Sequence, residues 1–348
     1  MSESEPHESS KYTVRRLERE GDLERWEAFV SASPEANPFS LWAWLDGAGR
    51  EVGAESEIWI VERAGEFVAG VALSSRRLAG RWHLGLPLAA YNTFHYRPPR
   101  DAHPSSITAE HLEISKVLIE ATRGRLKNWD LMLSPAITDV RPWTWAGWSA
   151  KPRYTYVLDL TRPLPLTHAV RKHLRKCQEA GITFDATWNL DILCAVFEAT
   201  KERRGFGTRL SMAGFRRLAT RLHEAGIATM GVARAADGES AAGHILLTVP
   251  GVPKSFHWAV GTHARYLTSG VSSWLMVETA AELTRRGFQS WDLCGADFPS
   301  IARFKSNLGG TLVHYFQVEA PRGALESTYT TLKSSWRAWS APGGESRR

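Results

Sequence analysis

Hydrophobic residues in the first half of the chain follow both helical and strand-like spacings. Asp22 to Val30 has the pattern of a short helix, and the apolar positions of Ala109 to Arg123 recur near every third or fourth residue. Between them, Glu57 to Glu62 and Phe67 to Ser74 are β-type runs around Ala64-Gly65, which indicates a hairpin. Further strands are predicted at Arg81 to Leu86 and Trp129 to Leu133. The first half therefore reads as α, β, β, β, α, β.

The second half has a similar mixture of elements. It begins near Thr167 with a helix in which Val170, Leu174 and Cys177 share one face, and Gly181 is placed to end it. Two more helices, then three strands, then a long helix follow. The predicted ranges are Asp191 to Lys201, Ser211 to Ala225, Ala228 to Arg234, Ala241 to Val249, Ser255 to Val260 and Val271 to Arg286, and the last two strands are Ser290 to Cys294 and Thr311 to Val318.

The two halves repeat each other weakly. A hairpin with Ala69-Gly70 precedes a helix and Trp129-Asp130-Leu131, while a hairpin with Ala242-Gly243 precedes a helix and Trp291-Asp292-Leu293. The shared order predicts a duplicated α/β chain. The predicted divisions are a disordered tail at 1–11, a first lobe at 12–165, a second lobe at 166–320 and a C-terminal tail at 321–348.

Composition supports a globular protein. The 348 residues are 43% hydrophobic and 23% charged, and 43 basic against 37 acidic residues give a net charge of +6, which allows an anionic partner. Three cysteines without CxxC spacing argue against disulfides and a cysteine-built metal site, and no apolar run has the length of a membrane span. We therefore expect a cytoplasmic location, no integral membrane segment and no catalytic metal.

The loop from Gly261 to Gly270 is a candidate anion-binding site. It contains Arg265-Tyr-Leu-Thr268-Ser-Gly270, which resembles the Arg/Gln-x-x-Gly-x-Gly loop of acyl-CoA-binding proteins with Thr in place of the first Gly. A strand, a loop and a helix in this order direct free backbone N–H groups at a bound phosphate. The alternative is an ordinary polar loop capped by Ser272 or Ser273.

A basic helix is the second candidate. Helical spacing puts Arg171 with Arg175, and Lys172 with Lys176, on either side of the apolar stripe, so that the helix presents two basic flanks to a phosphate chain. The alternative is a solvated amphipathic helix.

The segment from Asp292 to Gly310 is the third candidate. A strand ends at Cys294, a flexible turn containing Asp297 follows, and Arg303 and Lys305 then flank Phe304. Loops that follow strands carry the sites of open α/β sheets, and neighbouring cations suit a phosphate or carboxylate. The alternative is a surface loop with routine charges.

Together these segments resemble the Fem-type (FemAB-like) peptidoglycan-bridge transferases and their GNAT relatives over about residues 12 to 320. The resemblance rests on the motifs above, with Arg203-Arg204-Gly205, Pro152 to Leu160 and the Asn37-Pro38-Phe39 signature. It implies an α/β fold of two tandem GNAT-like lobes, with mixed β-sheets flanked by helices and a cleft between the lobes. A coiled-coil arm that some members carry is not evident here.

The resemblance also implies a chemistry. Characterised members use aminoacyl-tRNA as donor and form an amide on a muropeptide amine, and other members are thought to acylate small molecules or polysaccharide precursors. It implies acceptor binding by Arg303, Phe304, Lys305 and Arg204. Donor binding is expected at Arg265, Thr268 and Gly270 and at Arg171, Arg175 and Lys176, with no tightly bound cofactor.

Acyl transfer from an activated ester needs a donor clamp, a proton acceptor and oxyanion stabilisation, but no covalent nucleophile. Cys294 is therefore interpreted as a packed thiol. Candidate proton acceptors are Asp292, Asp297 and His257, although Asp130 at the matching place in the first half favours a structural Asp292, and His257 is alternatively a satisfied half-buried histidine.

Three functions remain open from the sequence. The first is aminoacyl transfer from aminoacyl-tRNA to an amine of a cell-wall precursor, polysaccharide or natural product. The second is acyl-CoA-dependent N-acylation on the same fold, and the third is a non-catalytic protein that binds nucleic acid or another partner. Trp143, Trp145 and Trp148 are interpreted as interlobe core or, alternatively, as a platform that stacks a base.

Overall fold

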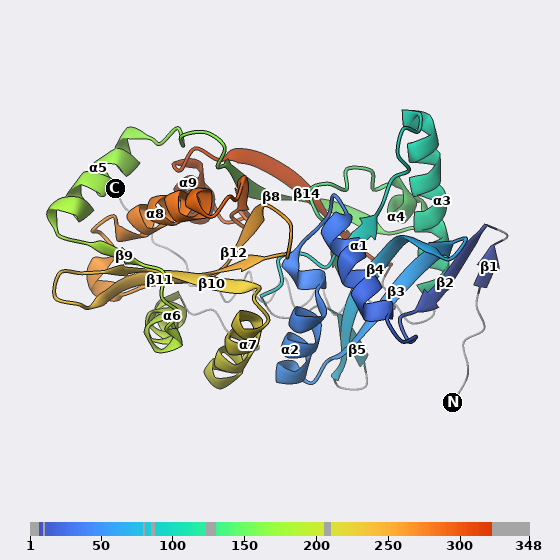
Figure 1. Cartoon of the computed structure of the whole chain (residues 1–348), viewed down its shortest axis with the longest axis horizontal. Helices are drawn as coiled ribbons and strands as arrows, with labels where there is room; N and C mark the ends of the chain where they lie inside the picture. Colours follow the sequence, from blue (N-terminus) through green and yellow to red (C-terminus); the bar gives the residue numbers. More distant parts are fainter. Residues whose placement is uncertain are drawn as a thin grey trace, which may run out of the picture.

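The chain forms two β-sheets joined side by side, with helices on the faces of both (Figure 1). The computed structural model describes residues 7–9, 11–78, 81–84, 88–122, 130–204 and 210–321. The predicted N-terminal tail falls largely, and the C-terminal tail from 322 onward wholly, outside these ranges. The predicted α/β class with two lobes of mixed sheet and helix is confirmed.

The first sheet is antiparallel and has the strand order β1-β2-β3-β4-β5, with β6 also paired to β4. Its β3–β4 hairpin turns at Ala64 and Gly65, whose φ angles of 51° and 83° are both left-handed, as a two-residue hairpin requires. The strands are β1 (His7–Ser9), β2 (Tyr12–Arg16), β3 (Glu55–Arg63), β4 (Glu66–Leu78), β5 (Arg81–Leu84) and β6 (Phe94–Tyr96), and the helices of this half are α1 (Asp22–Ala32), η1 (Pro38–Ser40), α2 (Trp42–Val52), α3 (Pro104–Thr122) and α4 (Arg141–Trp145).

The second sheet has eight strands in the order β7-β14-β8-β13-β12-β11-β10-β9. Only β12 and β13 pair in parallel; every other neighbouring pair in it is antiparallel. The strands are β7 (Asp130–Met132), β8 (Ser149–Asp159), β9 (Thr183–Asp185), β10 (Ala228–Arg234), β11 (Ser240–Thr248), β12 (Lys254–Thr262), β13 (Ser290–Asp292) and β14 (Thr311–Glu319).

Helices cover both faces of this sheet. Figure 1 shows α5 (His168–Glu179), α8 (Val271–Arg285) and α9 (Pro299–Ser306) on one face, and α6 (Leu190–Arg204) and α7 (Met212–Glu224) on the other. The short helix η2 (Ala264–Tyr266) lies in the loop before α8. Helix α2 of the first half packs beside α7, where Arg221 pairs with Asp46 at 2.7 Å and Arg217 pairs with Glu51 at 2.5 Å.

Most predicted elements are present, although α3 begins at Pro104 rather than Ala109 and β4 continues to Leu78 rather than ending at Ser74. The elements β1, β2, β6, β8, β9, α4 and α9 were not predicted. Pro152 and a mixed burial pattern hide the period-two signal of β8. Helix α9 has only eight residues, and it contains Arg303 and Lys305, which were expected in the loop segment after the flexible turn that follows Cys294. The strands β7 and β8 precede residue 165, and both pair within the second sheet. Residue 165 stays a proposed lobe boundary along the chain.

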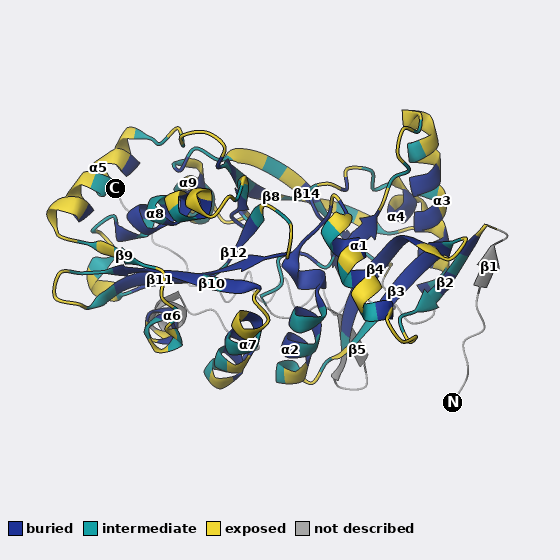
Figure 2. Cartoon of the chain, in the orientation of Figure 1, coloured by how far each residue is buried: buried dark blue, intermediate teal, exposed yellow. Residues whose placement is uncertain are grey.

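One large buried apolar cluster contains residues of both halves. Trp26, Phe39 and Trp44 of the first half belong to the same buried cluster as Phe215 and Phe256 of the second. The ring of Phe39 lies 6.4 Å from that of Phe256, edge to face. Figure 2 shows buried strands in both sheets. The relative placement of the halves is therefore fixed by packing.

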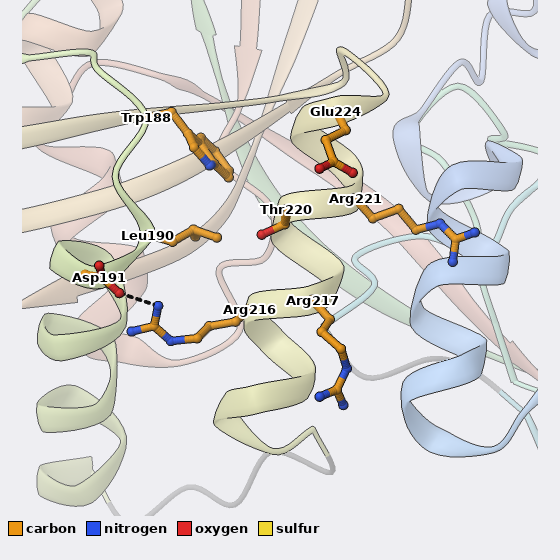
Figure 3. A pocket seen from close by; sticks show the side chains of 8 residues that line it. All are labelled: Trp188, Leu190, Asp191, Arg216, Arg217, Thr220, Arg221 and Glu224. Carbon is orange, nitrogen blue, oxygen red and sulfur yellow. Dashed lines mark hydrogen bonds and ion pairs between the residues drawn. The ribbon is translucent and has the colours of Figure 1, made fainter.

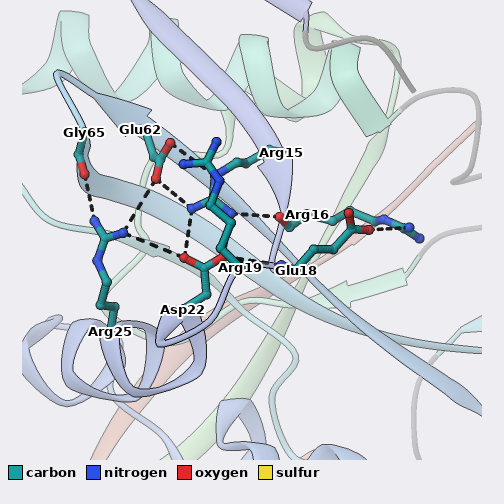
Figure 4. A network of polar contacts seen from close by, with 8 residues as sticks. All are labelled: Arg15, Arg16, Glu18, Arg19, Asp22, Arg25, Glu62 and Gly65. Carbon is teal, nitrogen blue, oxygen red and sulfur yellow. Dashed lines mark hydrogen bonds and ion pairs between the residues drawn. The ribbon is translucent and has the colours of Figure 1, made fainter. Parts of the chain in front are cut away.

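Arg15 holds the first lobe together through a buried ion network (Figure 4). Its guanidinium donates to both oxygens of Asp22, at 2.6 and 2.9 Å, and to both oxygens of Glu62, at 3.2 and 2.8 Å. Hydrogen bonds from Arg15 and from the backbone of Arg19 lower the pKa of Asp22 to about 2. The network ties β2, β3 and the start of α1 together.

Removing this guanidinium leaves two buried carboxylates without their shared partner. We expect Arg15→Ala to lower the free energy of unfolding by about 3 kcal/mol. The neighbouring Arg16 is half-exposed and pairs with Glu18 and Glu57, so Arg16→Ala is expected to cost about 1 kcal/mol or less. Urea unfolding of both variants tests this, and equal losses would contradict a special role for Arg15.

Candidate functional site

The second sheet divides between β12 and β13. The two strands pair in parallel only from Lys254 with Ser290 to Phe256 with Asp292, and β12 then continues to Thr262 without β13 beside it. The chain after β13 follows β8 instead, because the backbone amides of Leu293 and Ala296 donate to carbonyl oxygens of β8 at 2.9 and 2.6 Å. This division brings the third candidate segment to the middle of the second sheet.

Asp292 lies at the point of division and is fully buried. Its carboxylate accepts hydrogen bonds from the Tyr91 hydroxyl at 2.9 Å, the Thr155 hydroxyl at 2.8 Å and the backbone amide of Cys294 at 2.9 Å. The Lys254 ammonium lies 3.6 Å away. Each carboxylate oxygen thus has partners from the protein, and the carboxylate connects β13 to β8, to β12 and to the first half. The role of Asp292 as acceptor of a substrate proton stays a prediction.

Lys305 stabilises the turn that follows Asp292. Cys294 and Gly295 have left-handed φ angles of 53° and 81°, and the turn directs consecutive carbonyl oxygens toward one point. The buried Lys305 ammonium donates there to the carbonyl oxygens of Leu293, Cys294 and Gly295 at 2.5, 3.1 and 2.5 Å. Burial lowers the pKa of Lys305 and raises that of the Cys294 thiol. All three ammonium protons have acceptors in the protein.

The other predicted residues of this segment are more accessible. Asp297 pairs with Arg153 at 2.9 Å, accepts a hydrogen bond from the Tyr154 amide and keeps 24% of its side chain exposed. Arg303 is exposed on α9, whereas Phe304 packs against the core beneath α8. The side chain of Arg204 lies outside the described residues. In this segment Asp292 and Lys305 are therefore buried, with the Lys305 ammonium on the carbonyl oxygens of the turn, whereas Asp297 and Arg303 are accessible to solvent.

His257 is part of a buried aromatic group. Its ring lies 5.2 Å from that of His244 and 5.8 Å from that of Trp291, between the sheet and α8. Burial lowers the pKa of His244 to about 3, and burial also lowers the pKa of His257 well below its ordinary value, with smaller effects from His244 and from the nearby Lys305 charge. The imidazole is therefore neutral at physiological pH and enclosed. Its proposed role as a proton acceptor would require access that this geometry does not give.

The loop before α8 satisfies much of its own hydrogen bonding. Backbone amides of the loop donate internally at Arg265, Tyr266, Leu267, Ser269 and Val271. The Arg265 guanidinium pairs with Glu239 at 3.0 Å and with Asp237 at 3.4 Å. Thr268 is exposed.

His173 of α5 lies directly against Gly270, the N-cap of α8. A Cβ at Gly270 would lie 2.5 Å from Cγ of His173, and the φ angle of 89° also favours glycine. Nδ1 of His173 lies 3.2 Å from the Ser273 hydroxyl in the first turn of α8. An imidazole therefore lies where an incoming phosphate would approach the positive end of α8.

Helix α5 presents its cations to solvent. Val170 and Cys177 are buried, while Arg171, Lys172, Arg175 and Lys176 are exposed on the outer side. The Arg171 guanidinium donates to the carbonyl oxygen of Leu166 at 2.7 Å. Among the described residues, no acidic side chain pairs with Lys172, Arg175 or Lys176. These three charges lie beside the loop before α8, since α5 packs on α8 through His173.

Sequence reasoning missed three groups that surround Asp292. Tyr91 comes from an irregular segment of the first half, Thr155 from the unpredicted β8 and Lys254 from the start of β12. Tyr91 and Lys254 belong to no motif, whereas Thr155 lies within Pro152 to Leu160, a motif to which no site role was assigned; Tyr91 is 201 positions from Asp292 in sequence. A tyrosine in a loop has no periodic signal, so only the fold reveals this contact.

A separate groove of about 520 Å³ lies between α6 and α7 (Figure 3). Trp188 stacks on His223 at 4.1 Å, and the Arg216 guanidinium pairs with Asp191 at 2.5 Å. None of the residues that line this groove belongs to β12 or β13.

Within the described ranges no group of three or more His, Cys, Asp or Glu could hold a metal ion, and none of the helices there is long and apolar enough to cross a bilayer.

We expect Lys305→Met to lower the free energy of unfolding by about 2–4 kcal/mol, because three buried carbonyl oxygens lose a charged donor. Arg303→Met, on the exposed side of the same helix, is the matched control and should change it by about 0.5 kcal/mol or less. Denaturant titrations compare the two. A fully stable Lys305→Met protein without activity would favour the substrate role that the sequence predicts.

The buried histidines predict a pH dependence of stability. His95 and His244 have pKa values of about 3 in the folded chain and about 6.5 when unfolded, so below pH 6.5 unfolding takes up protons. The free energy of unfolding should then fall by up to about 1.4 kcal/mol per pH unit for each histidine. His244→Gln removes one of these histidines and should reduce the slope by up to about 1.4 kcal/mol per pH unit. Urea titrations at pH 7, 6 and 5 measure the slope, and an unchanged slope would contradict the prediction.

Comparisons with known proteins agree with this architecture. Residues 167–306 match a family model described as an acetyltransferase (GNAT) domain. The fold is similar to that of the FemX crystal structure, with a TM-score of 0.63 and 12% identity over 87% of this chain and 96% of that one. No curated protein sequence matches the chain.

Two further solved structures share the fold. A tandem GNAT protein from the clavulanic acid biosynthesis pathway gives a TM-score of 0.53 and 16% identity over 90% of this chain and 100% of that one. The structure of L-PGS from Bacillus licheniformis gives a TM-score of 0.55 and 13% identity over 89% of this chain and 95% of that one. Residues 167–306 thus match a GNAT domain model, and the chain as a whole shares its fold with FemX and with a tandem GNAT protein.

Proposed function

We propose that the chain is an acyltransferase that moves an aminoacyl group from aminoacyl-tRNA to an amine. The observation that carries the proposal is the pair formed by α5 and the loop before α8. Three exposed cations, Lys172, Arg175 and Lys176, lie on α5 without acidic partners among the described residues. A run of unpaired cations along one helix suits a chain of phosphates.

The loop before α8 supports a donor other than acyl-CoA. A pyrophosphate-binding loop offers free backbone amides and an open helix N-terminus. Here the amides donate within the loop, Arg265 is neutralised by Asp237 and Glu239, and His173 covers Gly270. A pyrophosphate would have to displace these contacts, whereas phosphates lying along α5 would not. Thr268 and Gly270 then border the donor site without clamping a phosphate.

The transfer itself needs little more than positioning. The attacking amine replaces the ester oxygen on the aminoacyl carbonyl, and a proton leaves the nitrogen as the amide forms. Of the three candidate acceptors Asp292, Asp297 and His257, Asp297 has the exposed carboxylate, so we assign it the proton. Arg153 keeps that carboxylate in place, and Arg303 is the exposed cation of α9 that would meet an anionic group of the acceptor.

Turnover of charged tRNA tests the donor. Purified full-length protein is mixed with a pool of aminoacyl-tRNAs and hydroxylamine as a surrogate amine, and separately with acetyl-CoA and hydroxylamine. We expect protein-dependent deacylation of one tRNA class and no thioester consumption. Thioester consumption without a tRNA effect would instead assign the chain to the CoA-dependent branch.

Variants of α5 test the site. We expect Lys172→Ala, Arg175→Ala and Lys176→Ala together to weaken tRNA binding, and to reduce the slope of log K against log salt by about 2 to 3, since each lost phosphate contact contributes about 0.7–0.9. Lys116→Ala, at an exposed lysine on α3 of the other half, is the control. Equal salt slopes for the triple variant and the control would contradict the assignment.

A further inference from the structure

The groove between α6 and α7 has the size of a small-molecule site. Its volume of about 520 Å³ lies within the roughly 300–1,000 Å³ that such sites occupy. Figure 3 shows Trp188 and Leu190 on one wall, and Thr220 and Glu224 of α7 on the other. A ligand in the groove would therefore meet an apolar wall and a polar wall at the same time.

The apolar wall is held in place by the protein itself. The ring of Trp188 stacks on that of His223, with their centroids 4.1 Å apart and their planes 4° from parallel. The ring of His223 is fixed in turn, because its Nδ1 donates to the carbonyl oxygen of Ala228 at 3.0 Å. Asn189, the residue after Trp188, accepts a hydrogen bond from the Asp191 amide and so caps α6. A preformed aromatic surface of this kind loses little conformational entropy when a ligand binds.

The charged side chains that line the groove are all paired, with one exception. Arg216 reaches across the groove to Asp191 at 2.5 Å (Figure 3). Arg217 and Arg221 point instead toward the first half, where each pairs with an acid of α2. The exception is Glu224, whose carboxylate has no ion pair or hydrogen bond to any residue that the structure describes. The free charge of the groove is therefore negative.

The position of Glu224 is unfavourable for the helix. It is the last residue of α7, where the helix dipole places partial negative charge. Arg221, which is close enough in sequence to pair with it, binds Asp46 instead. Thr220 lies one turn before Glu224 on the same face, and within the described ranges its hydroxyl also has no hydrogen-bond partner. A carboxylate and a hydroxyl thus offer acceptor oxygens to the groove.

We propose that this groove binds a primary ammonium group carried on an aromatic or aliphatic body. Glu224 supplies the opposite charge and Thr220 a second acceptor for the ammonium N–H groups, while the body packs on Trp188 and Leu190. An anionic ligand would instead meet the carboxylate of Glu224 and arginines whose charge is already balanced.

This ligand site is separate from the proposed transfer site. Helices α6 and α7 lie on the face of the second sheet opposite α5, α8 and α9 (Figure 1). None of the lining residues belongs to the basic helix or to the segment that follows β13. The proposal uses neither tRNA nor any other donor, so it does not depend on the proposed function.

Calorimetric titration of the full-length protein tests the ligand class. The two probes are phenethylamine and 3-phenylpropionate, which share a phenyl ring and a two-carbon spacer but carry an ammonium and a carboxylate respectively. We expect phenethylamine to bind at least about tenfold more tightly, since a hydrogen bond to a charged group is worth a factor of this size. Equal affinities, or no binding of phenethylamine, would overturn the proposal.

Variants locate the bound amine. We expect Glu224→Gln to weaken phenethylamine binding by about tenfold, because the carboxylate charge is lost. Glu179→Gln is the matched control, since Glu179 is likewise the exposed last residue of its helix, α5, and its variant should bind as the unchanged protein does. An affinity unaffected by Glu224→Gln would contradict the assignment to this groove.

An amine is also the expected acceptor of the proposed transfer, so the acceptor site needs its own control. Asp297→Asn alters the carboxylate assigned to that site, and we expect it to leave phenethylamine binding unchanged. Binding that is lost in Asp297→Asn and retained in Glu224→Gln would place the amine at the acceptor site and overturn the proposal.

Discussion

The buried carboxylate of Asp292 is the constraint on which the centre of the second lobe depends. A charge without solvent needs donors from the protein, and here they come from the first half, from β8, from β12 and from the following turn. Each donor fixes one element relative to the end of β13. Because Tyr91 is one of them, the place where β12 and β13 separate is set partly by the lobe that does not contain it.

The sequence was sufficient for the class of fold and for most elements, because their signals are local. The helix capped by Thr167 and the strand Ala228–Arg234 follow from spacing and capping residues alone. The position of β8 within the second sheet could not be predicted, since sheet order depends on contacts between distant residues. For the same reason the sequence indicated a duplication but not that β7 and β8 pair beyond the proposed lobe boundary.

The candidate site shows the same limit at the level of side chains. Sequence motifs located the Asp292 segment, the loop before α8 and the basic helix, and the structure brings α5 and that loop together through His173 and Gly270. Motifs did not show which way a cation faces. Lys305 turns inward to carbonyl oxygens, and Arg265 meets acids from the β10–β11 turn, while Lys172 and Arg175 stay exposed. Orientation of this kind is set by tertiary packing.

The continuous core between the lobes has a consequence for how such a chain can change over time. Phe39 and Trp44 pack directly on Phe256 and Trp258, so substitutions at these positions in either half must compensate each other. Exchange of one lobe between related proteins would pair unmatched surfaces unless both sets of aromatic residues moved together. The two halves are thus expected to evolve as one unit, with variation tolerated most easily on α5 and on the outer loops.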